Sequence, residues 1–315
     1  MQYNIAFQHF YLKKGFLIVW TACLNFIFHP AGKKIYMNYK WQKTSLTILL
    51  FFLVLSTNAA TVDTVIVYSK CMHKNVKCVV IMPERYKNDT MHFPVLYLLH
   101  GWSGNYSNWV NMAPDLLHAV DENGFLVVCP DGGYDSWYFD SPIDTTIRYE
   151  TNIAIEIPAY IDSNYRTIAN RNARAIAGLS MGGHGALYLA LRHQNNFSAA
   201  GSMSGGVDFR PFPENWGLKD RLGDYATRKD NWDKNVVIDL VDSLQNGTLA
   251  LIFDCGVNDF FIQVNRNLHQ KLLDKKIDHD YTERPGEHNW VYWNNSIQYQ
   301  LLFFHNHFIQ NKVLK

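Results

Sequence analysis

The chain has 315 residues, of which 48% are hydrophobic and 18% charged, and its formal net charge is +1. This is the composition of a globular protein with a sizeable core. The near-neutral charge and the absence of a basic run argue against a nucleic-acid partner. The sequence has no Walker A motif, no G-x-G-x-x-G loop and no Cys/His spacing typical of zinc sites, so we expect chemistry that needs no cofactor and no metal.

The first 60 residues are predicted to be a leader. Two lysines precede the apolar run Leu46–Leu55, and small residues follow up to Ala60. This order is typical of a secretory signal peptide, here about residues 37–60. This interpretation leads to the hypothesis that translation starts at Met37 and that residues 1–36 are an over-long start.

We therefore expect an exported protein, secreted or periplasmic, that is not inserted in a membrane once the signal is cleaved. The alternative is a chain that keeps this segment as a membrane anchor, although its apolar runs are short for a membrane span.

Residues 61–315 are predicted to form one α/β domain. The expected strands are 64–69, 76–82, 95–99, 125–129, 173–177, 199–202, 249–253 and 279–283. The expected helices are 111–123, 149–164, 183–191, 260–275 and 291–310. This alternation predicts a mostly parallel sheet with helices on both faces, and ligands bound beyond the carboxyl ends of the strands.

The most informative motif is Gly178–Gly182, a G-x-S-x-G sequence between a predicted strand and a predicted helix. A serine at such a sharp turn exposes its hydroxyl to a base, and the helix N-terminus offers N–H groups to a developing oxyanion. The motif by itself is weak evidence, because small residues are common in turns. Ser180 is therefore assigned as a nucleophile only together with partners further along the chain.

A nucleophile of this kind predicts an acid and then a histidine, each following a late strand. Asp259 lies in the loop after the apolar run 249–253, and His288 lies in the Pro-Gly loop after the last strand. His288 is assigned as the base that takes the proton of Ser180, and Asp259 as the group that orients its imidazole. Asp254 is the alternative acid, but its place near the strand end favours a structural role.

A second oxyanion donor is expected in the loop His100–Gly104, which follows a buried strand. The backbone N–H groups of Trp102 and Met181 are the candidates, and such donors contribute about 3–4 kcal/mol each to transition-state stabilisation. His100 is expected to shape this loop through a hydrogen bond. The side chains of Trp102 and Trp290 are expected beside the substrate, because aromatic walls suit acyl chains, phenolic acyl groups or sugar rings.

Gly205–Asn235 interrupts the regular alternation. This segment is long, polar and irregular, which is typical of a lid or a binding loop. The alternative is a surface excursion packed by its own aromatic side chains.

The cysteines suggest one disulfide. If Lys74-Asn75 is a two-residue turn, Cys71 and Cys78 lie opposite each other in a hairpin and could form a disulfide in an exported protein. Cys129 and Cys255 end buried strands and are expected to be inert core thiols.

Five segments together resemble one known family. They are Leu98–Gly101, Pro130–Gly133 with Trp137-Tyr138, Ala177–Gly183, Asp254–Gly256 with Asp259, and Pro285-Gly286 with His288–Trp290. The chain resembles the esterase D / S-formylglutathione hydrolase-like group of α/β-hydrolases, which includes tributyrin, feruloyl and acetyl-xylan esterases and the mycolyltransferases. The resemblance spans about residues 62–308. It implies an α/β-hydrolase fold with Ser180, Asp259 and His288 as the catalytic triad.

The favoured function is an exported serine carboxylesterase that forms an acyl-enzyme and acts on a small ester or an acylated carbohydrate, such as acetyl or feruloyl groups of plant polysaccharide. Export disfavours S-formylglutathione hydrolysis, since that substrate is intracellular, but a thioesterase of this type stays an alternative. An acyltransferase of the mycolyl type is another alternative. A binding protein on a hydrolase scaffold is disfavoured, because all three triad candidates are present. The acyl group, the alcohol and the oligomeric state are left open.

Overall fold

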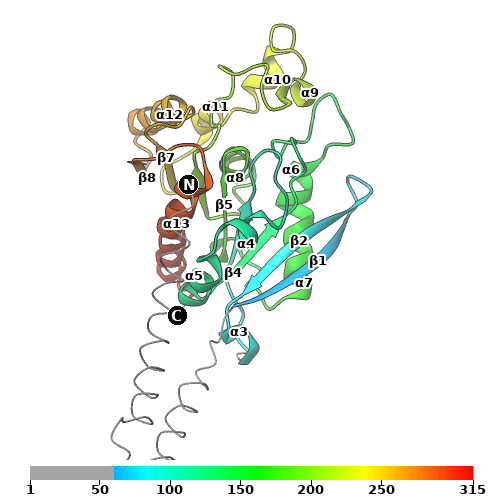
Figure 1. The fold of residues 1–315 in the computed structure, drawn as a ribbon, viewed down its shortest axis with the longest axis vertical. Helices are drawn as coiled ribbons and strands as arrows, with labels where there is room; N and C mark the ends of the chain where they lie inside the picture. The colour runs from blue at the N-terminus through cyan, green and yellow to red at the C-terminus, as the bar shows by residue number, and fades with distance from the viewer. Residues whose placement is uncertain (1–59, 89, 315) are drawn as a thin grey trace, which may run out of the picture. The chain divides into compact units, whose positions relative to one another are not determined.

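The computed structural model describes residues 60–88 and 90–314, so the predicted leader lies outside the described residues apart from Ala60. Their centre is an eight-stranded sheet in the order β1-β2-β4-β3-β5-β6-β7-β8, with β1 and β2 antiparallel and the neighbouring pairs from β4 to β8 parallel (Figure 1). The strands are β1 Thr61–Ser69, β2 Lys74–Met82, β3 Val95–Leu99, β4 Leu126–Pro130, β5 Arg174–Leu179, β6 Ala199–Met203, β7 Ala250–Gly256 and β8 Asp280–Arg284.

Helices cover both faces of this sheet. The longer ones are α5 Leu116–Asn123, α7 Ile157–Asn164, α8 Met181–Arg192, α12 Ile262–Asp274 and α13 Trp290–Gln310. The shorter helical segments are α3 Arg85–Asn88, α4 Asn108–Met112, α6 Tyr149–Thr151, η1 Asn152–Glu156, η2 Arg171–Ala173, α9 Leu218–Leu222, α10 Lys229–Asp233, α11 Val237–Leu240 and η3 Val241–Ser243. The predicted fold class, a mostly parallel sheet with helices on both faces, is confirmed.

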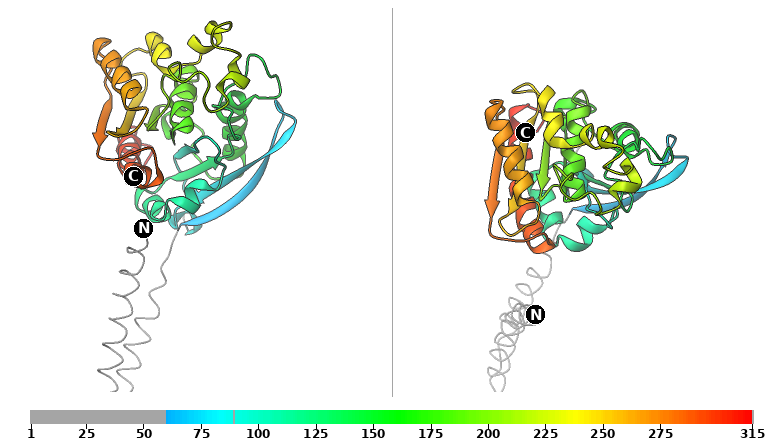
Figure 2. Two further views of the ribbon diagram at one scale, coloured as in Figure 1. Left: turned by 45° about the horizontal axis from the view of Figure 1, so that its top comes forward. Right: turned by 90° about the horizontal axis from the view of Figure 1, so that it is seen from above.

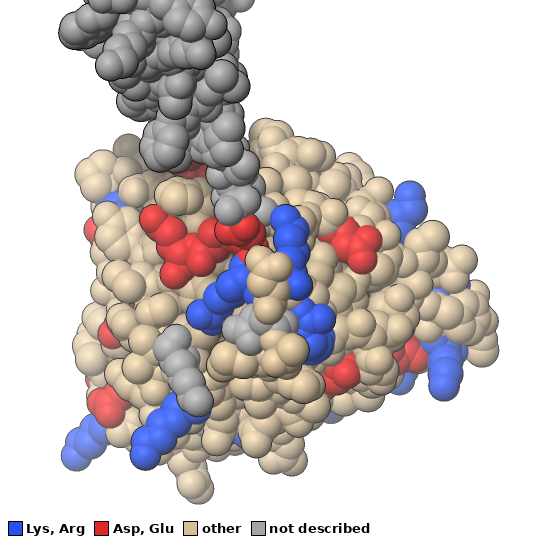
Figure 3. Space-filling view, turned by 90° about the horizontal axis from the view of Figure 1, so that it is seen from below, with Lys and Arg blue, Asp and Glu red and all other residues tan. Residues whose placement is uncertain are grey.

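The central strands are apolar on both sides, as a doubly covered parallel sheet requires. In β3, Val95, Tyr97 and Leu99 pack with α7, α8 and α12, whereas Leu96 and Leu98 pack with α5 and α13. The β1–β2 hairpin forms one edge of the sheet (Figure 2). Lys and Arg side chains and Asp and Glu side chains both occur on the face seen from below (Figure 3). None of the helices formed by residues 60–88 and 90–314 is long and apolar enough to cross a membrane.

Proline alters two of the predicted helices. The helix expected at 111–123 is two helices, α4 and α5, because Pro114 lacks an N–H and forces Ala113 out of the helical conformation (φ −112°, ψ 85°). The helix expected at 149–164 is continuous but changes type. The π-helical turn η1 directly precedes α7, in which Pro158 has no N–H to donate.

The predicted disulfide between Cys71 and Cys78 is wrong. Ser69 pairs with Lys74, so the hairpin turn consists of residues 70–73 and not of Lys74-Asn75. Cys71 lies in this turn, Cys78 lies opposite Val65 in the sheet, and both thiols are free. The side chain of Glu156 in η1 holds the turn by accepting hydrogen bonds from the N–H groups of residues 70 and 71. Cys129 and Cys255 are buried free thiols, as predicted.

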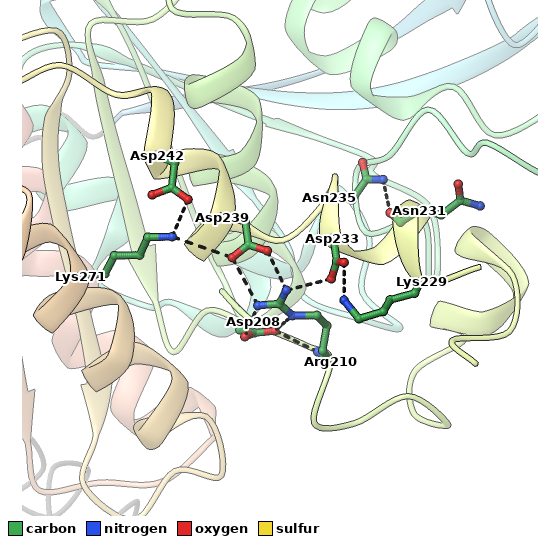
Figure 4. A network of polar contacts seen from close by, with 9 residues as sticks. All are labelled: Asp208, Arg210, Lys229, Asn231, Asp233, Asn235, Asp239, Asp242 and Lys271. Carbon is green, nitrogen blue, oxygen red and sulfur yellow. Dashed lines mark hydrogen bonds and ion pairs between the residues drawn. The ribbon is translucent and has the colours of Figure 1, made fainter. Parts of the chain in front are cut away.

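The segment between β6 and β7 is more ordered than the sequence suggested. Residues 205–243, which we call the cap segment, contain α9, α10 and α11, and they bury Phe209 and Trp232. A polar network also holds the cap segment together (Figure 4). Arg210 contacts Asp208, Asp233 and Asp239 at 2.7–2.9 Å. Within the predicted segment Gly205–Asn235 only the five residues of α9 and the five of α10 are helical. Most of the segment is therefore irregular, as predicted, but it is packed around its own buried aromatic side chains.

Helix α8, which begins next to Ser180, is anchored at its other end by a buried carboxylate. Glu150 in α6 accepts hydrogen bonds from the Tyr188 hydroxyl at 2.5 Å and from Arg192 Nε at 2.8 Å, and it lies 3.0 Å from His193 Nε2. Burial raises the pKa of Glu150, but the hydrogen bonds from His193, Tyr188 and Arg192 outweigh it and lower the pKa to about 2.

We predict that Glu150→Gln destabilises the protein in a pH-dependent way. A carboxylate with a lowered folded-state pKa stabilises the fold above its ordinary pKa and loses this contribution as the pH falls toward 2. The variant should lose on the order of 3 kcal/mol of unfolding free energy at pH 7 and progressively less below about pH 4.5. Urea unfolding from pH 7 to pH 3 measures this, and an equal loss at every pH would contradict it.

Candidate active site

Ser180 occupies a strained turn between β5 and α8. Its backbone has φ 55° and ψ −118°, a conformation that non-glycine residues rarely adopt. The turn is held by a hydrogen bond from the Ser180 N–H to the Met203 carbonyl at 2.9 Å. It also lies close to the loop after β3, because a Cβ on Gly182 would lie 2.5 Å from the His100 carbonyl oxygen. Gly182 thus allows the turn and the loop after β3 to lie closer together than any side chain at this position would permit.

The structure brings together the three residues predicted to act on the substrate. The Ser180 Oγ lies 2.8 Å from His288 Nε2, and His288 Nδ1 lies 2.8 Å from Asp259 Oδ2. With Nδ1–H donating to the carboxylate, Nε2 is left as the acceptor for the serine hydroxyl. Asp259 is buried, and its other oxygen accepts the Phe261 N–H at 2.8 Å. This arrangement can remove a proton from the Ser180 hydroxyl.

Contacts between the loop after β7 and the loop after β8 fix the positions of Asp259 and His288 relative to each other. Asp259 follows β7 and His288 follows β8, which are adjacent parallel strands. The Asn258 N–H donates to the Gly286 carbonyl at 3.0 Å, which joins the two loops directly. A Cβ on Gly256 would lie 2.5 Å from the same carbonyl oxygen, so the close contact between the loops needs a glycine there.

Asp254, the alternative acid, has a different environment. It is almost completely buried, and it accepts hydrogen bonds from the Tyr292 hydroxyl at 2.9 Å, Ser296 Oγ at 2.6 Å and Gln300 Nε2 at 3.0 Å. These three residues follow one another at intervals of four along α13. Burial raises the pKa of Asp254. The carboxylate therefore attaches α13 to β7, whereas the hydrogen bond to His288 comes from Asp259.

His100 shapes the loop after β3, as the sequence suggested. The Gly132 N–H donates to His100 Nε2 at 2.8 Å, so the proton of the neutral ring is on Nδ1, which lies 2.8 Å from the Gly101 carbonyl oxygen. Burial lowers the pKa of His100 and keeps the ring neutral. The Tyr138 hydroxyl donates to the His100 carbonyl at 2.9 Å. These bonds join the loops after β3 and β4.

The two N–H groups predicted to bind an oxyanion belong to the loop after β3 and to the first residue of α8. Ser103 and Gly104 donate their N–H groups to the carbonyls of Tyr134 and Gly101, whereas the Trp102 N–H has no backbone acceptor among the residues that the structure describes. Met181 is the first residue of α8, where N–H groups have no acceptor within the helix.

An aromatic cavity of about 330 Å³ opens beside Ser180 and His288. Trp102 and Trp290, the two side chains expected near the substrate, both line it. Trp290 packs edge-to-face against Trp109 and Trp293. This volume is at the small end of the ~300–1,000 Å³ that is usual for ligand pockets.

The sequence did not single out two further aromatic residues of this cavity, Trp216 and Phe260. Phe260 directly follows Asp259, and that position alone could have indicated it. Trp216 lies in the cap segment, more than thirty residues from Ser180 in the chain. The sequence indicated a lid or a binding loop at Gly205–Asn235, but it did not assign this side chain to the site. In the described part of the chain, no three His, Cys, Asp or Glu side chains are grouped so as to hold a metal ion.

Comparisons with known proteins give one consistent result. Residues 69–304 match the family model Esterase, described as "Putative esterase". The chain is 30% identical over 252 residues to an acetyl esterase of Caldicellulosiruptor saccharolyticus, covering 73% of this chain and 92% of that protein. It is 26% identical over 242 residues to the S-formylglutathione hydrolase of Bos taurus, covering 69% and 83%. A solved structure of a ferulic acid esterase superposes with a TM-score of 0.68 at 27% identity, covering 79% of this chain and 98% of that one.

We predict that Gly182→Ala separates the turn at Ser180 from the loop after β3. The added methyl group would lie 2.5 Å from the His100 carbonyl oxygen and 2.7 Å from that of Leu99. Because both are backbone atoms, they cannot move aside as a side chain would. The unfolding free energy should fall by about 1–3 kcal/mol, as for other overpacked sites. Urea unfolding measures this, and an unchanged midpoint and slope would contradict it.

Proposed function

Because this chain belongs to the Esterase family and is a serine hydrolase that acts on carboxylic esters, we propose that it works through Ser180, His288 and Asp259 and an acyl-enzyme intermediate. The observation that carries the proposal is the unbroken hydrogen-bond chain from Asp259 through His288 to Ser180, with 2.8 Å at each step. Its end lies in the aromatic cavity, where an ester can reach it.

Acylation begins when Ser180 Oγ attacks the ester carbonyl carbon and His288 Nε2 takes the hydroxyl proton. The carbonyl oxygen becomes an oxyanion, which accepts hydrogen bonds from the N–H groups of Trp102 and Met181. His288 then gives its proton to the leaving alcohol, and the C–O bond of the ester breaks. Asp259 holds the imidazole in one tautomer and stabilises its positive charge.

Deacylation repeats these steps with water. His288 takes a proton from the water as its oxygen attacks the acyl carbon, and the proton passes to Ser180 Oγ when the carboxylic acid leaves. The acyl-enzyme is the branch point between hydrolysis and transfer, because an alcohol in the place of water gives a new ester.

The proposed substrate is a small acyl ester, such as an acetyl or feruloyl ester of a carbohydrate. Two observations support this choice: the cavity is small and aromatic, and proteins named acetyl esterase and ferulic acid esterase are among those the chain resembles. An aromatic wall provides contact area for an acyl group or for the flat face of a sugar ring.

We predict that hydrolysis depends on Ser180 and on Asp259, the two ends of the hydrogen-bond chain. Ser180→Ala should lower kcat about 10⁶-fold, and Asp259→Asn about 10⁴-fold by favouring the wrong imidazole tautomer. The assay uses p-nitrophenyl acetate, butyrate and octanoate, together with methyl ferulate.

Ser163→Ala, which changes an exposed serine of α7, is the matched control and should keep full activity. Undiminished turnover in Ser180→Ala would refute the assignment. Folded wild-type protein that turns over none of these esters would contradict hydrolysis and favour transfer to an alcohol acceptor.

We also propose that the protein is exported, on the basis of the signal peptide predicted at residues 37–60. N-terminal sequencing of protein recovered outside the cytoplasm should give a mature chain that begins near Thr61, because cleavage is expected after Ala59 or Ala60. A mature N-terminus before residue 50 would contradict cleavage at this site and favour an uncleaved anchor.

A further inference from the structure

Trp216 is held in a strained backbone conformation. Its φ is +54° and that of Gly217 is +71°, so two consecutive residues adopt the left-handed conformation. For a bulky residue such as tryptophan this conformation is unfavourable, and it persists only where the surroundings enforce it. Such outliers gather at ligand sites more often than elsewhere.

The surroundings of Trp216 enforce its position from two sides. Trp137 Nε1, on a buried indole, donates to the Trp216 carbonyl at 3.2 Å. Gly217 lies against Asp135, so closely that a Cβ would be 2.7 Å from Asp135 Oδ2. Asp135 is itself held by Arg221 Nη2 at 2.9 and 3.1 Å from its two carboxylate oxygens.

The result is that the Trp216 indole forms one wall of the cavity that contains Ser180 and His288. It stacks on Phe260, with ring centroids 5.5 Å apart and an interplanar angle of 20°. The centroid of the Phe260 ring lies 4.2 Å from the centroid of the His288 ring. The three rings form a continuous series from the cap segment to the imidazole.

Ion pairs link the start of the cap segment to its end, and its end to α12. Arg210 joins Asp208 near the start of the cap segment to Asp233 and Asp239 near its end, as Figure 4 shows. Lys271 of α12 lies 2.8 Å from Asp242, which attaches the end of the segment to the sheet-covering helices. These contacts restrain the cap segment, which carries Trp216.

We propose that Trp216 is a specificity-determining residue that limits the size of the ester group admitted beside Ser180. The proposal rests on the proposed function of Ser180 and goes beyond it by assigning the size limit to one side chain of the cap segment. Removing the indole joins its volume to the cavity of about 330 Å³. Differences of a single methylene in such pockets change kcat/KM about 10–200-fold.

The test compares Trp216→Ala with wild type in two substrate series. One series varies the acyl group, from p-nitrophenyl acetate to octanoate, and the other varies the alcohol, from ethyl acetate to 2-naphthyl acetate. Trp216→Ala should raise the ratio of kcat/KM for the bulky ester to that for the small ester at least tenfold in one series or both. Trp216→Phe should give an intermediate ratio, because it restores part of the wall.

Tyr225→Ala is the matched control, since Tyr225 is an aromatic residue of the same segment that packs on Trp232 and does not line the cavity. Its ratios should equal those of wild type. If Trp216→Ala does not fold, Trp216→Leu, which keeps an apolar contact with Phe260, replaces it with the same expectation.

If the wild-type protein is active but the kcat/KM ratios of the Trp216 variants stay within twofold of the wild-type ratios, the size limit is overturned. The role of Ser180 is then left intact. Wild-type protein without activity above Ser180→Ala would instead refute the proposed function itself. The two failures are therefore distinguishable.

Discussion

The parallel arrangement of β5, β7 and β8 is the constraint on which the site depends. Parallel strands bring their carboxyl ends to one edge of the sheet, so Ser180, Asp259 and His288 meet although 108 residues separate the first from the last. Strand pairing alone does not fix the positions of the loops that follow these strands. The contact between Gly256 and Gly286, and the hydrogen bond from Asn258 to Gly286, remove that freedom and bring the imidazole within 2.8 Å of both partners.

The two halves of the cavity are held by different forces. On the sheet side, short loops are fixed by backbone hydrogen bonds and by the neutral ring of His100, which joins two loops. On the cap side, the chain has no sheet to pair with, and ion pairs of Arg210 and Arg221 with aspartates add to the local backbone hydrogen bonds. These pairs are partly buried, so they are screened by salt less than surface pairs would be. Specificity can thus change in the cap segment while the hydrogen-bond chain stays the same.

Most of the fold and the main site candidates were predictable because they depend on local pattern. Buried parallel strands are continuous apolar runs, and Asp259 and His288 follow such runs at the places where a nucleophile turn requires partners. The break at Pro114 was also visible in the sequence, since proline disfavours a helical residue before it.

What the sequence could not reveal depends on contacts between distant residues. The hairpin turn at Cys71 is determined by Glu156, more than eighty residues away, and not by the turn residues themselves. Likewise, the position of Trp216 depends on Trp137 and on the Arg221–Asp135 pair. No periodicity or turn propensity encodes such pairings, so the wall of the cavity could not be inferred before the fold.

Backbone strain connects these observations. Among the described residues, the non-glycine positions with positive φ are His73, Ser103, Trp137, Tyr138, Ser180, Ser204, Trp216, Lys276 and Lys312. Three of them, Ser103, Ser180 and Trp216, line the cavity that His288 also lines. Each strained residue costs about 1–3 kcal/mol, which the buried sheet and the clamped cap segment must offset. The rigidity of the surroundings is therefore a requirement of the site: a looser cap segment would let Trp216 relax, and the cavity would lose the wall that defines its size.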